Sequence, residues 1–184
     1  MRRTKILAIS GSLRKASLNT ALLRAVSKLA PADVRIELYN GMDKLPLFNP
    51  DIEAIDPPAV ADLRNRLLGA DGVLIASPEY AHGVTGVMKN ALDWMVGCEA
   101  FVNKPVALLN ASPRATHAQA ALKETITMMS ARIIDEASIT VPILGSKLDE
   151  LEIVSDPGIS AALHEAVLAF RRAIEFHRAE DCNG

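Results

Sequence analysis

Short apolar segments alternate with stretches of helical periodicity along the 184 residues of this chain, and no other feature restricts its fold as strongly. Residues 6–9, 72–76 and 106–109 contain no polar side chain, as is typical of strands buried on both faces of a sheet. Residues 18–29 instead place leucine, alanine and valine three and four positions apart, which predicts an amphipathic helix. Strands that alternate with helices in this way predict βαβ units and a parallel sheet.

The order of the strands follows from which of them are exposed. Residues 34–38 alternate apolar with polar side chains, so one face of this second strand meets water, as at a sheet edge. A fifth strand is expected near residues 139–141, and a final helix carries an apolar stripe through residues 163–174. Buried first and third strands beside a half-exposed second strand favour the order 2-1-3-4-5. The predicted fold is therefore α/β, a flavodoxin-like three-layer sandwich with a five-stranded parallel sheet, formed as a single domain over residues 1–184.

The composition is that of a globular domain and argues against several classes of function. Apolar residues make up 49% of the sequence and charged residues 23%. The formal net charge is −2 and there is no long basic run, so we expect no nucleic-acid partner. The first apolar run ends at Ser10, too early for a signal sequence or a membrane span, so we expect a cytoplasmic protein with no membrane partner. Cys98 and Cys182 lack metal-ligand spacing, which indicates reduced thiols and no metal site.

The loop after the first strand is rich in groups that donate hydrogen bonds. It leads directly into the first helix, whose unpaired backbone N–H groups add a partial positive charge. Because the loop matches neither GxGxxG nor the P-loop pattern, a terminal phosphate monoester fits it better than a pyrophosphate. A simple N-cap role would explain Ser17 but not the other residues. The candidate phosphate-binding residues are Ser10, Ser12, Arg14, Ser17, Asn19 and Thr20.

The loop after the third strand has the composition expected beside a flat heteroaromatic ring. Residues 77–83 include proline, tyrosine, alanine and glycine, and such rings are commonly bound by backbone amides and by shape. Apolar residues from Val84 to Met95 then form a stripe that predicts a helix packed on the sheet. In sheets of the predicted order, ligands bind outside the carboxyl ends of the strands near the switch between strands 1 and 3. Both loops are therefore expected to serve one ligand.

Together the two loops resemble those of the NADPH-dependent FMN reductase family, which includes related quinone, chromate and azo-dye reductases. Residues 11–19 are similar to the family's FMN phosphate loop, GSLRxxSxN, and residues 78–80 and 86–94 are similar to its PEYN and PGxLKNAIDW segments. The likeness runs through residues 4–176 in strand order and loop placement. It implies FMN as cofactor, NADPH or NADH as co-substrate, and a homodimer or homotetramer with flavin sites near a subunit interface.

The resemblance also implies roles for particular residues. The FMN phosphate would be held by Ser12, Arg14, Ser17 and Asn19. The isoalloxazine ring would lie beside Pro78, Glu79, Tyr80 and the backbone of Ala81, His82 and Gly83, and Ser112 in the third such loop completes the candidate set. The chain departs from the family pattern at Ala81-His82, where many members have Asn followed by a small residue, and at Thr85, where proline is usual. Residues 112–117 lack the glycine pair that commonly approaches the ring.

The expected reaction is a ping-pong transfer of hydride from the nicotinamide to bound FMN and then on to a small-molecule electron acceptor, which is a quinone, a flavin, chromate or an azo compound. No catalytic side chain is predicted, because the cofactor supplies the difficult chemistry. Several roles stay open: Glu79 as a catalytic carboxylate or a structural hydrogen-bond partner, His82 as a donor at the site or a solvated residue, and Trp94 in the core or at an interface. The alternative functions are a flavodoxin-like electron carrier or flavin-binding module without nicotinamide oxidase activity, and a scaffold that has lost the flavin.

Overall fold

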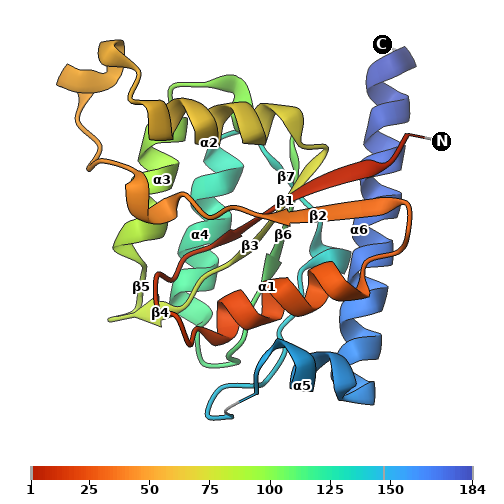
Figure 1. Ribbon diagram of the computed structural model, residues 1–184. Coiled ribbons are helices and arrows are strands. Elements are labelled where there is room, and N and C mark those ends of the chain that lie inside the picture. Colours follow the sequence, from red (N-terminus) through yellow and green to blue (C-terminus); the bar gives the residue numbers. More distant parts are fainter. Residues whose placement is uncertain (1, 147, 184) are drawn as a thin grey trace.

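The structure, a computed structural model, describes residues 2–146 and 148–183. Side-chain burial is described as far as residue 180. Its centre is a sheet of five parallel strands in the order β2-β1-β3-β6-β7 (Figure 1). The strands are β1 (Thr4–Ser10), β2 (Val34–Leu38), β3 (Gly72–Ala76), β6 (Pro105–Leu109) and β7 (Arg132–Ile133). Numbered along the sheet, this is the order 2-1-3-4-5, so the predicted flavodoxin-like winding is confirmed.

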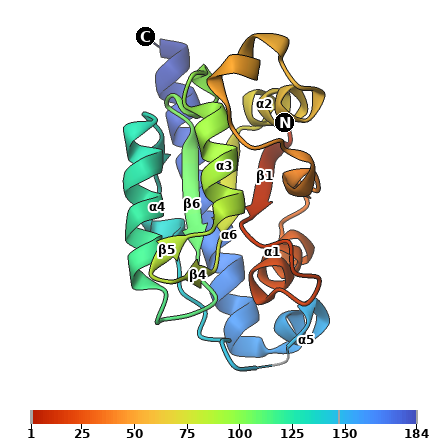
Figure 2. The same cartoon turned by 90° about the vertical axis from the view of Figure 1, so that its left-hand side faces the viewer.

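Helices cover both faces of the sheet and make the fold a three-layer sandwich (Figures 1 and 2). One face carries α1 (Leu18–Leu29) and α6 (Pro157–Asn183), with the short α5 (Glu150–Ser155) packed against both of them. The other face carries α2 (Pro58–Gly69), α3 (Gly86–Met95) and α4 (Thr116–Met128). None of the helices in the described residues combines the length and the apolar character needed to cross a bilayer.

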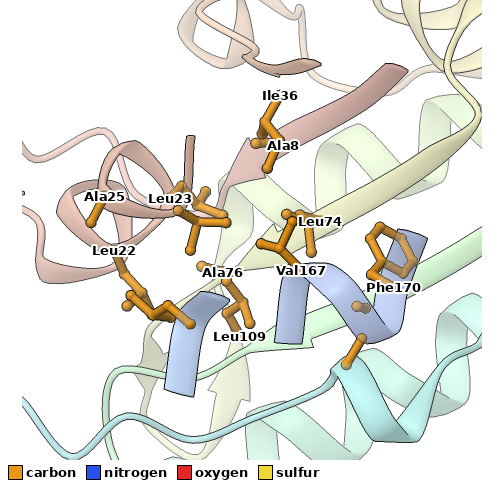
Figure 3. Close-up of a cluster of buried hydrophobic side chains, with 14 of the residues drawn as sticks. Ala8, Leu22, Leu23, Ala25, Ile36, Leu74, Ala76, Leu109, Val167 and Phe170 are labelled. Atoms are coloured by element: carbon orange, nitrogen blue, oxygen red, sulfur yellow. The ribbon is translucent and has the colours of Figure 1, made fainter. Parts of the chain in front are cut away.

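The two cores follow from the alternation of side chains along the strands. In β1, Ile6 and Ala8 face the α1–α6 layer, whereas Leu7 and Ile9 face the α2–α3–α4 layer. Figure 3 shows the first core, where Leu22 and Leu23 of α1 and Val167 and Phe170 of α6 meet Leu74 of β3. The ring of Phe170 is fully buried, with an exposed fraction of 0%. The stripe predicted in the final helix therefore faces the sheet, as expected.

The fifth strand lies elsewhere than the sequence predicted. The prediction of a strand near residues 139–141 is wrong, because β7 is the two-residue segment Arg132–Ile133, which pairs with the start of β6. A short 3₁₀ helix, η4 (Asp135–Ala137), then takes the chain away from the sheet edge. The chain returns at Thr140 for a single parallel bridge to Asn110, directly after β6. The predicted segment therefore contributes one bridge at the carboxyl end of the sheet.

The long proline-rich segment after β2 folds over the start of α2 and the outer side of α3. It contains two short 3₁₀ helices, η1 (Met42–Lys44) and η2 (Pro50–Ile55), and a third, η3 (Glu99–Phe101), follows α3. The indole Nε1 of Trp94 donates to the carbonyl of Pro46 at 2.8 Å, and Asn90 Nδ2 donates to the same carbonyl at 2.9 Å. Trp94 is only 4% exposed. Of the two roles left open for Trp94, the structure therefore shows core packing.

An ion cluster at the amino edge of the sheet joins the two ends of the chain. The Asp71 carboxylate, 10% exposed, pairs with Arg178 of α6 and with Arg2, and it accepts a hydrogen bond from the Lys5 backbone N–H at 2.8 Å. Burial would raise the pKa of Asp71, but the Arg178 guanidinium and the Lys5 N–H outweigh burial and hold that pKa below its ordinary value. A carboxyl whose pKa is lowered in the folded state stabilises that state above its unfolded pKa, about 4, and loses this effect as pH falls through the folded pKa.

We expect Asp71→Asn to lower the free energy of unfolding by about 1–2 kcal/mol at pH 7, since Arg178 would lose its charged partner in a half-buried site. The difference from the wild type should shrink toward pH 3, where the wild-type carboxyl also takes up a proton. Urea denaturation of both proteins at pH 7 and pH 3 measures this difference in the free energy of unfolding. Asp135→Asn is the control, because Asp135 is 71% exposed and pairs with the exposed Lys123, and the substitution should change stability little. Equal losses at pH 7 and pH 3 would contradict the electrostatic explanation.

Candidate functional site

The site is built where β1 and β3 end side by side at the carboxyl edge of the sheet. The loop that follows each strand is tied to the other: Gly11 N donates to Ala76 O at 2.9 Å, and Thr85 Oγ1 donates to Gly11 O at 2.8 Å. A Cβ on Gly11 would stand 2.1 Å from Ser77 Oγ and 3.1 Å from Ser77 Cα. Only glycine allows this approach, so the two loops form one rigid unit.

The first loop has the donor-rich conformation that the sequence predicted. Ser17 is the N-cap of α1 and accepts from Thr20 N at 3.3 Å. Ser10 Oγ and Thr20 Oγ1 lie 2.8 Å apart and form a hydrogen bond with each other, which joins the start of the loop to α1. Ser12 Oγ accepts from Arg14 N at 3.3 Å, and the Arg14 guanidinium forms no ion pair with an acidic residue in the described part of the chain. The guanidinium is therefore available to a ligand.

Asn19 differs from the other polar residues of this loop because it is buried without being satisfied. It is 7% exposed, and its Oδ1 has no hydrogen-bond partner. Buried side-chain amides are normally hydrogen-bonded, and an orphaned one needs an explanation. Rotation of the amide exchanges Oδ1 and Nδ2, so this side chain can turn an N–H donor toward an anion.

Asn19 lines a cavity of about 300 Å³ that lies between the loops after β1, β3 and β6. The volume falls at the small end of the range of ligand sites. From the predicted set, the first loop contributes Ser12, Arg14, Ser17 and Asn19, and the other loops contribute Pro78, Glu79, Tyr80 and Ser112. Ser10 and Thr20 line a neighbouring hollow instead, and Ala81, His82 and Gly83 lie outside the cavity.

The ring loop continues into a two-stranded hairpin, β4 (Glu79–Tyr80) and β5 (Gly83–Val84), which rests against α4 (Figure 2). Its two turn residues have positive φ, 49° at Ala81 and 60° at His82. A two-residue hairpin turn needs this conformation at both positions, where Asn and Gly are the preferred residues. Alanine and histidine there hold strained backbone, and such strain is often found at ligand-binding loops.

Glu79 fastens this hairpin to α4. Its Oε2 accepts from Ala118 N at 2.8 Å, and its Oε1 lies 3.1 Å from His82 Nδ1. The Ala118 N–H, with the His82 ring, keeps the pKa of Glu79 below its ordinary value, although burial acts in the opposite direction. The His82 ring also meets the His117 ring edge-on at 4.5 Å between centroids. Of the two roles left open for Glu79, this geometry supports the structural hydrogen bond.

The third loop supplies residues that the sequence analysis did not assign. Asn110 is 4% exposed; its Oδ1 accepts from Ser112 N at 2.9 Å and its Nδ2 donates to Ala115 O at 3.4 Å. Arg114 and Ala115 also line the cavity, and Leu144 reaches it from the segment before α5. The cavity therefore combines two arginines, several hydroxyls, two amides and the carboxylate of Glu79 with apolar walls. That set suits a ligand with an anionic end and a flat apolar body.

The model of the family described as NADPH-dependent FMN reductase matches residues 4–143, well over half of the chain. The chain belongs to this family. Membership makes it an NAD(P)H-dependent flavin oxidoreductase, as the sequence predicted, with FMN as cofactor and NAD(P)H as co-substrate.

Individual relatives agree with this assignment. The NAD(P)H-dependent FMN reductase PA1204 of Pseudomonas aeruginosa is 36% identical over 143 residues, which cover 74% of this chain and 77% of that protein. The quinone reductase of Escherichia coli is 27% identical over 181 residues, or 94% and 96% of the two chains. Among solved structures, the flavoenzyme NAD(P)H:(acceptor) oxidoreductase FerB of Paracoccus denitrificans superposes with a TM-score of 0.75 at 28% identity, covering 95% of this chain and 98% of its own.

The structure also explains one of the departures from the pattern of FMN reductases. Thr85 stands where proline is usual, and its Oγ1 has two partners: it donates to Gly11 O and accepts from Met88 N at 3.3 Å as the N-cap of α3. The threonine therefore both starts the helix and fastens the loop after β1. In the third loop, Asn110 orders the backbone from 110 to 115 where the usual glycine pair is missing.

Proposed function

We propose that this FMN reductase holds the phosphate of FMN between Ser12, Arg14, Ser17 and Asn19 at the start of α1. The observation that carries the proposal is the Asn19 side chain, because it is buried, its Oδ1 has no hydrogen-bond partner and it forms part of the cavity wall. A phosphate monoester offers acceptor oxygens to that amide and negative charge to Arg14 and the helix N-terminus. Ser10 and Thr20 support the loop through their mutual hydrogen bond.

We infer that the flavin ring lies between the second and third loops. Pro78 and Tyr80 line one side of the cavity and Ser112 and Ala115 line another, so a flat ring would contact mostly backbone and apolar atoms. Tyr80 is 60% exposed and could cover the mouth of the site. Ala81, His82 and Gly83 set the shape of the hairpin from outside the cavity, and Glu79 anchors it to α4.

FMN held by Ser12, Arg14, Ser17 and Asn19 would supply the redox chemistry, the transfer of reducing equivalents from a nicotinamide to an acceptor. The chain itself then has three tasks: to hold the phosphate, to orient the ring and to keep one face open for stacking. No proton has to be moved by a side chain, and the carboxylate of Glu79 is already hydrogen-bonded to Ala118 N. We propose a quinone as the small-molecule acceptor, because the Escherichia coli relative is named quinone reductase.

Two measurements test the proposal. The purified protein should be yellow with an absorption band at about 450 nm after incubation with FMN, and the holoprotein should oxidise NADPH in the presence of a benzoquinone. Flavin binding without NADPH oxidation would favour the flavodoxin-like electron carrier instead. A protein that stays colourless with micromolar FMN would overturn the proposed site altogether.

Arg14→Ala should weaken FMN binding about tenfold, because a charge-assisted hydrogen bond is lost from an exposed side chain whose effect water partly screens. Titration of the apoprotein with FMN, followed by the quenching of flavin fluorescence, measures the dissociation constant. Arg35→Ala is the matched control, since Arg35 is exposed on β2 and pairs with Glu37. An unchanged dissociation constant in Arg14→Ala would remove Arg14 from the phosphate site.

We also propose a homodimer or homotetramer in the cytoplasm. Exposed apolar side chains support self-association: Leu47, Phe48 and Ile55 in the segment between β2 and α2, and Val96 at the end of α3. Exposed apolar patches often mark protein interfaces. Cys98 is a free thiol, as is usual in a reducing compartment. The single-domain organisation proposed for residues 1–184 is supported by the single five-stranded sheet with helices on both faces.

A further inference from the structure

Three loops surround the cofactor cavity, and their order along it follows from the order of the strands. The loops come after β1, β3 and β6, which lie next to one another in the sheet (Figure 1). A ligand whose phosphate is bound by the first loop, at the start of α1, therefore extends through this cavity toward the third loop. For FMN the far end of the ligand is the flavin ring, so the inference below rests on the proposed function.

The third loop brings a cation, Arg114, to this far end of the cavity. Of the two arginines that line the cavity, Arg14 belongs to the first loop and Arg114 to the third. Arg114 is exposed, and its guanidinium forms no ion pair with an acidic residue in the part of the chain that the structure describes. Its charge is therefore available to whatever occupies the ring end of the cavity.

Hydrogen bonds order the backbone from which the Arg114 side chain extends. The Arg114 N–H donates to Ser112 Oγ at 3.2 Å, and the Ala115 N–H donates to Ser112 O, also at 3.2 Å. The buried Asn110 holds both sides of this turn, because its Oδ1 accepts from Ser112 N and its Nδ2 donates to Ala115 O. The charged side chain is thus attached to an ordered loop at the edge of the cavity, which makes its electrostatic effect partly preorganised.

Glu79, the carboxylate that lines the same cavity, has partners other than Arg114. Its Oε2 accepts from Ala118 N at 2.8 Å, in the first turn of α4, and its Oε1 lies 3.1 Å from His82 Nδ1. The positive end of the α4 dipole acts on this carboxylate as well. Among the described residues that line the ring end of the cavity, Arg114 therefore supplies a positive charge that no carboxylate offsets directly.

Reduction changes the charge of the flavin ring and leaves that of the phosphate as it was. Hydride transfer from a nicotinamide brings two electrons and one proton to the ring, so the ring gains one negative charge until a second proton binds. A cation beside the ring stabilises this added charge, whereas the groups at the phosphate bind both redox states alike. The two arginines of the cavity are therefore expected to act on different properties of the cofactor.

We propose that Arg114 lies at the ring end of FMN, where its guanidinium binds the reduced cofactor more strongly than the oxidised one and thereby raises the reduction potential of the bound flavin. Arg14, at the phosphate, contributes to affinity in both states. The role of Arg114 belongs to a segment in which the chain departs from the family pattern, since residues 112–117 contain an arginine and lack the usual glycine pair.

The test measures the reduction potential of bound FMN, by anaerobic equilibration of the holoprotein with a reference dye. Arg114→Gln should weaken the binding of reduced FMN about tenfold relative to oxidised FMN, which lowers the potential of this two-electron couple by about 30 mV. The Kd for oxidised FMN should change less than about threefold. Arg114→Lys keeps the charge and should keep most of the wild-type potential. Arg172→Gln is the control, because Arg172 is exposed on α6 and does not line the cavity, and it should change neither quantity.

A second readout separates the effect of charge from a structural effect. The difference in potential between the wild type and Arg114→Gln should shrink as the pH is lowered, because the reduced ring then takes up its second proton and loses its charge. An unchanged potential in Arg114→Gln, or an equal fall in Arg114→Lys, would overturn the inference. A wild-type protein that does not bind FMN would contradict the proposed function instead, so the two failures can be told apart.

Discussion

Gly11→Ala is expected to destabilise the protein by about 1–3 kcal/mol and to weaken FMN binding at the same time. The added Cβ would lie 2.1 Å from Ser77 Oγ and 2.6 Å from Ser77 Cβ, and the next atom is the Ser77 backbone at 3.1 Å. Rotation of the serine side chain removes the first contact but not the other two. One of the two loops must therefore move, and the hydrogen bond from Gly11 N to Ala76 O is strained with it.

Urea denaturation of the apoprotein measures the loss of stability, and titration with FMN measures the loss of affinity. Gly69→Ala is the matched control, since no atom lies within 4 Å of a Cβ built there, in the last turn of α2. That variant should be as stable as the wild type or slightly more stable. If Gly11→Ala has the same urea midpoint as the wild type and binds FMN normally, the close approach of Gly11 to Ser77 does not hold the two loops together.

The sheet was predictable because its central strands are short runs without polar residues. Residues 6–9, 72–76 and 106–109 fall inside β1, β3 and β6, and alternating exposure identified β2 as an edge. The fifth strand was not predictable. It has two residues and begins with Arg132, whereas Ile139-Thr140-Val141 has the residue types that favour strands. The turn through η4 decides which segment pairs with β6, and that is a tertiary effect.

The site was predictable where its residues are neighbours in sequence. The donors of the first loop sit together because a strand leads directly into a helix, and Ser12, Arg14, Ser17 and Asn19 do line one cavity. Leu144 carried no signal, since it reaches the cavity from a segment more than a hundred residues away from the phosphate loop. The role of Gly11 was also hidden. A single glycine argues against a pyrophosphate loop, but the contact of Gly11 with Ser77 depends on the register of β1 and β3.

Asn19→Leu should change stability and cofactor binding in opposite directions. Leucine has a similar size and removes a buried oxygen that has no partner, so the apoprotein should gain about 1 kcal/mol in free energy of unfolding. The same change removes a buried amide from the proposed phosphate site, and FMN affinity should fall roughly 10- to 100-fold. The loss should exceed that of Arg14→Ala, because Asn19 is shielded from water.

The matched control is Asn65→Leu, the same substitution at an exposed position on α2, which should leave FMN binding unchanged. Thermal unfolding with and without FMN separates the two effects, since ligand binding raises the apparent stability with the logarithm of the ratio of ligand concentration to Kd. As apoprotein, Asn19→Leu should have a higher melting temperature than the wild type. At FMN concentrations that saturate the wild type, its melting temperature should be lower. If Asn19 serves only packing, Asn19→Leu should instead give a less stable apoprotein that binds FMN with unchanged affinity. Selection does not maintain a destabilising asparagine that binds no ligand, so an asparagine kept for packing would stabilise the fold.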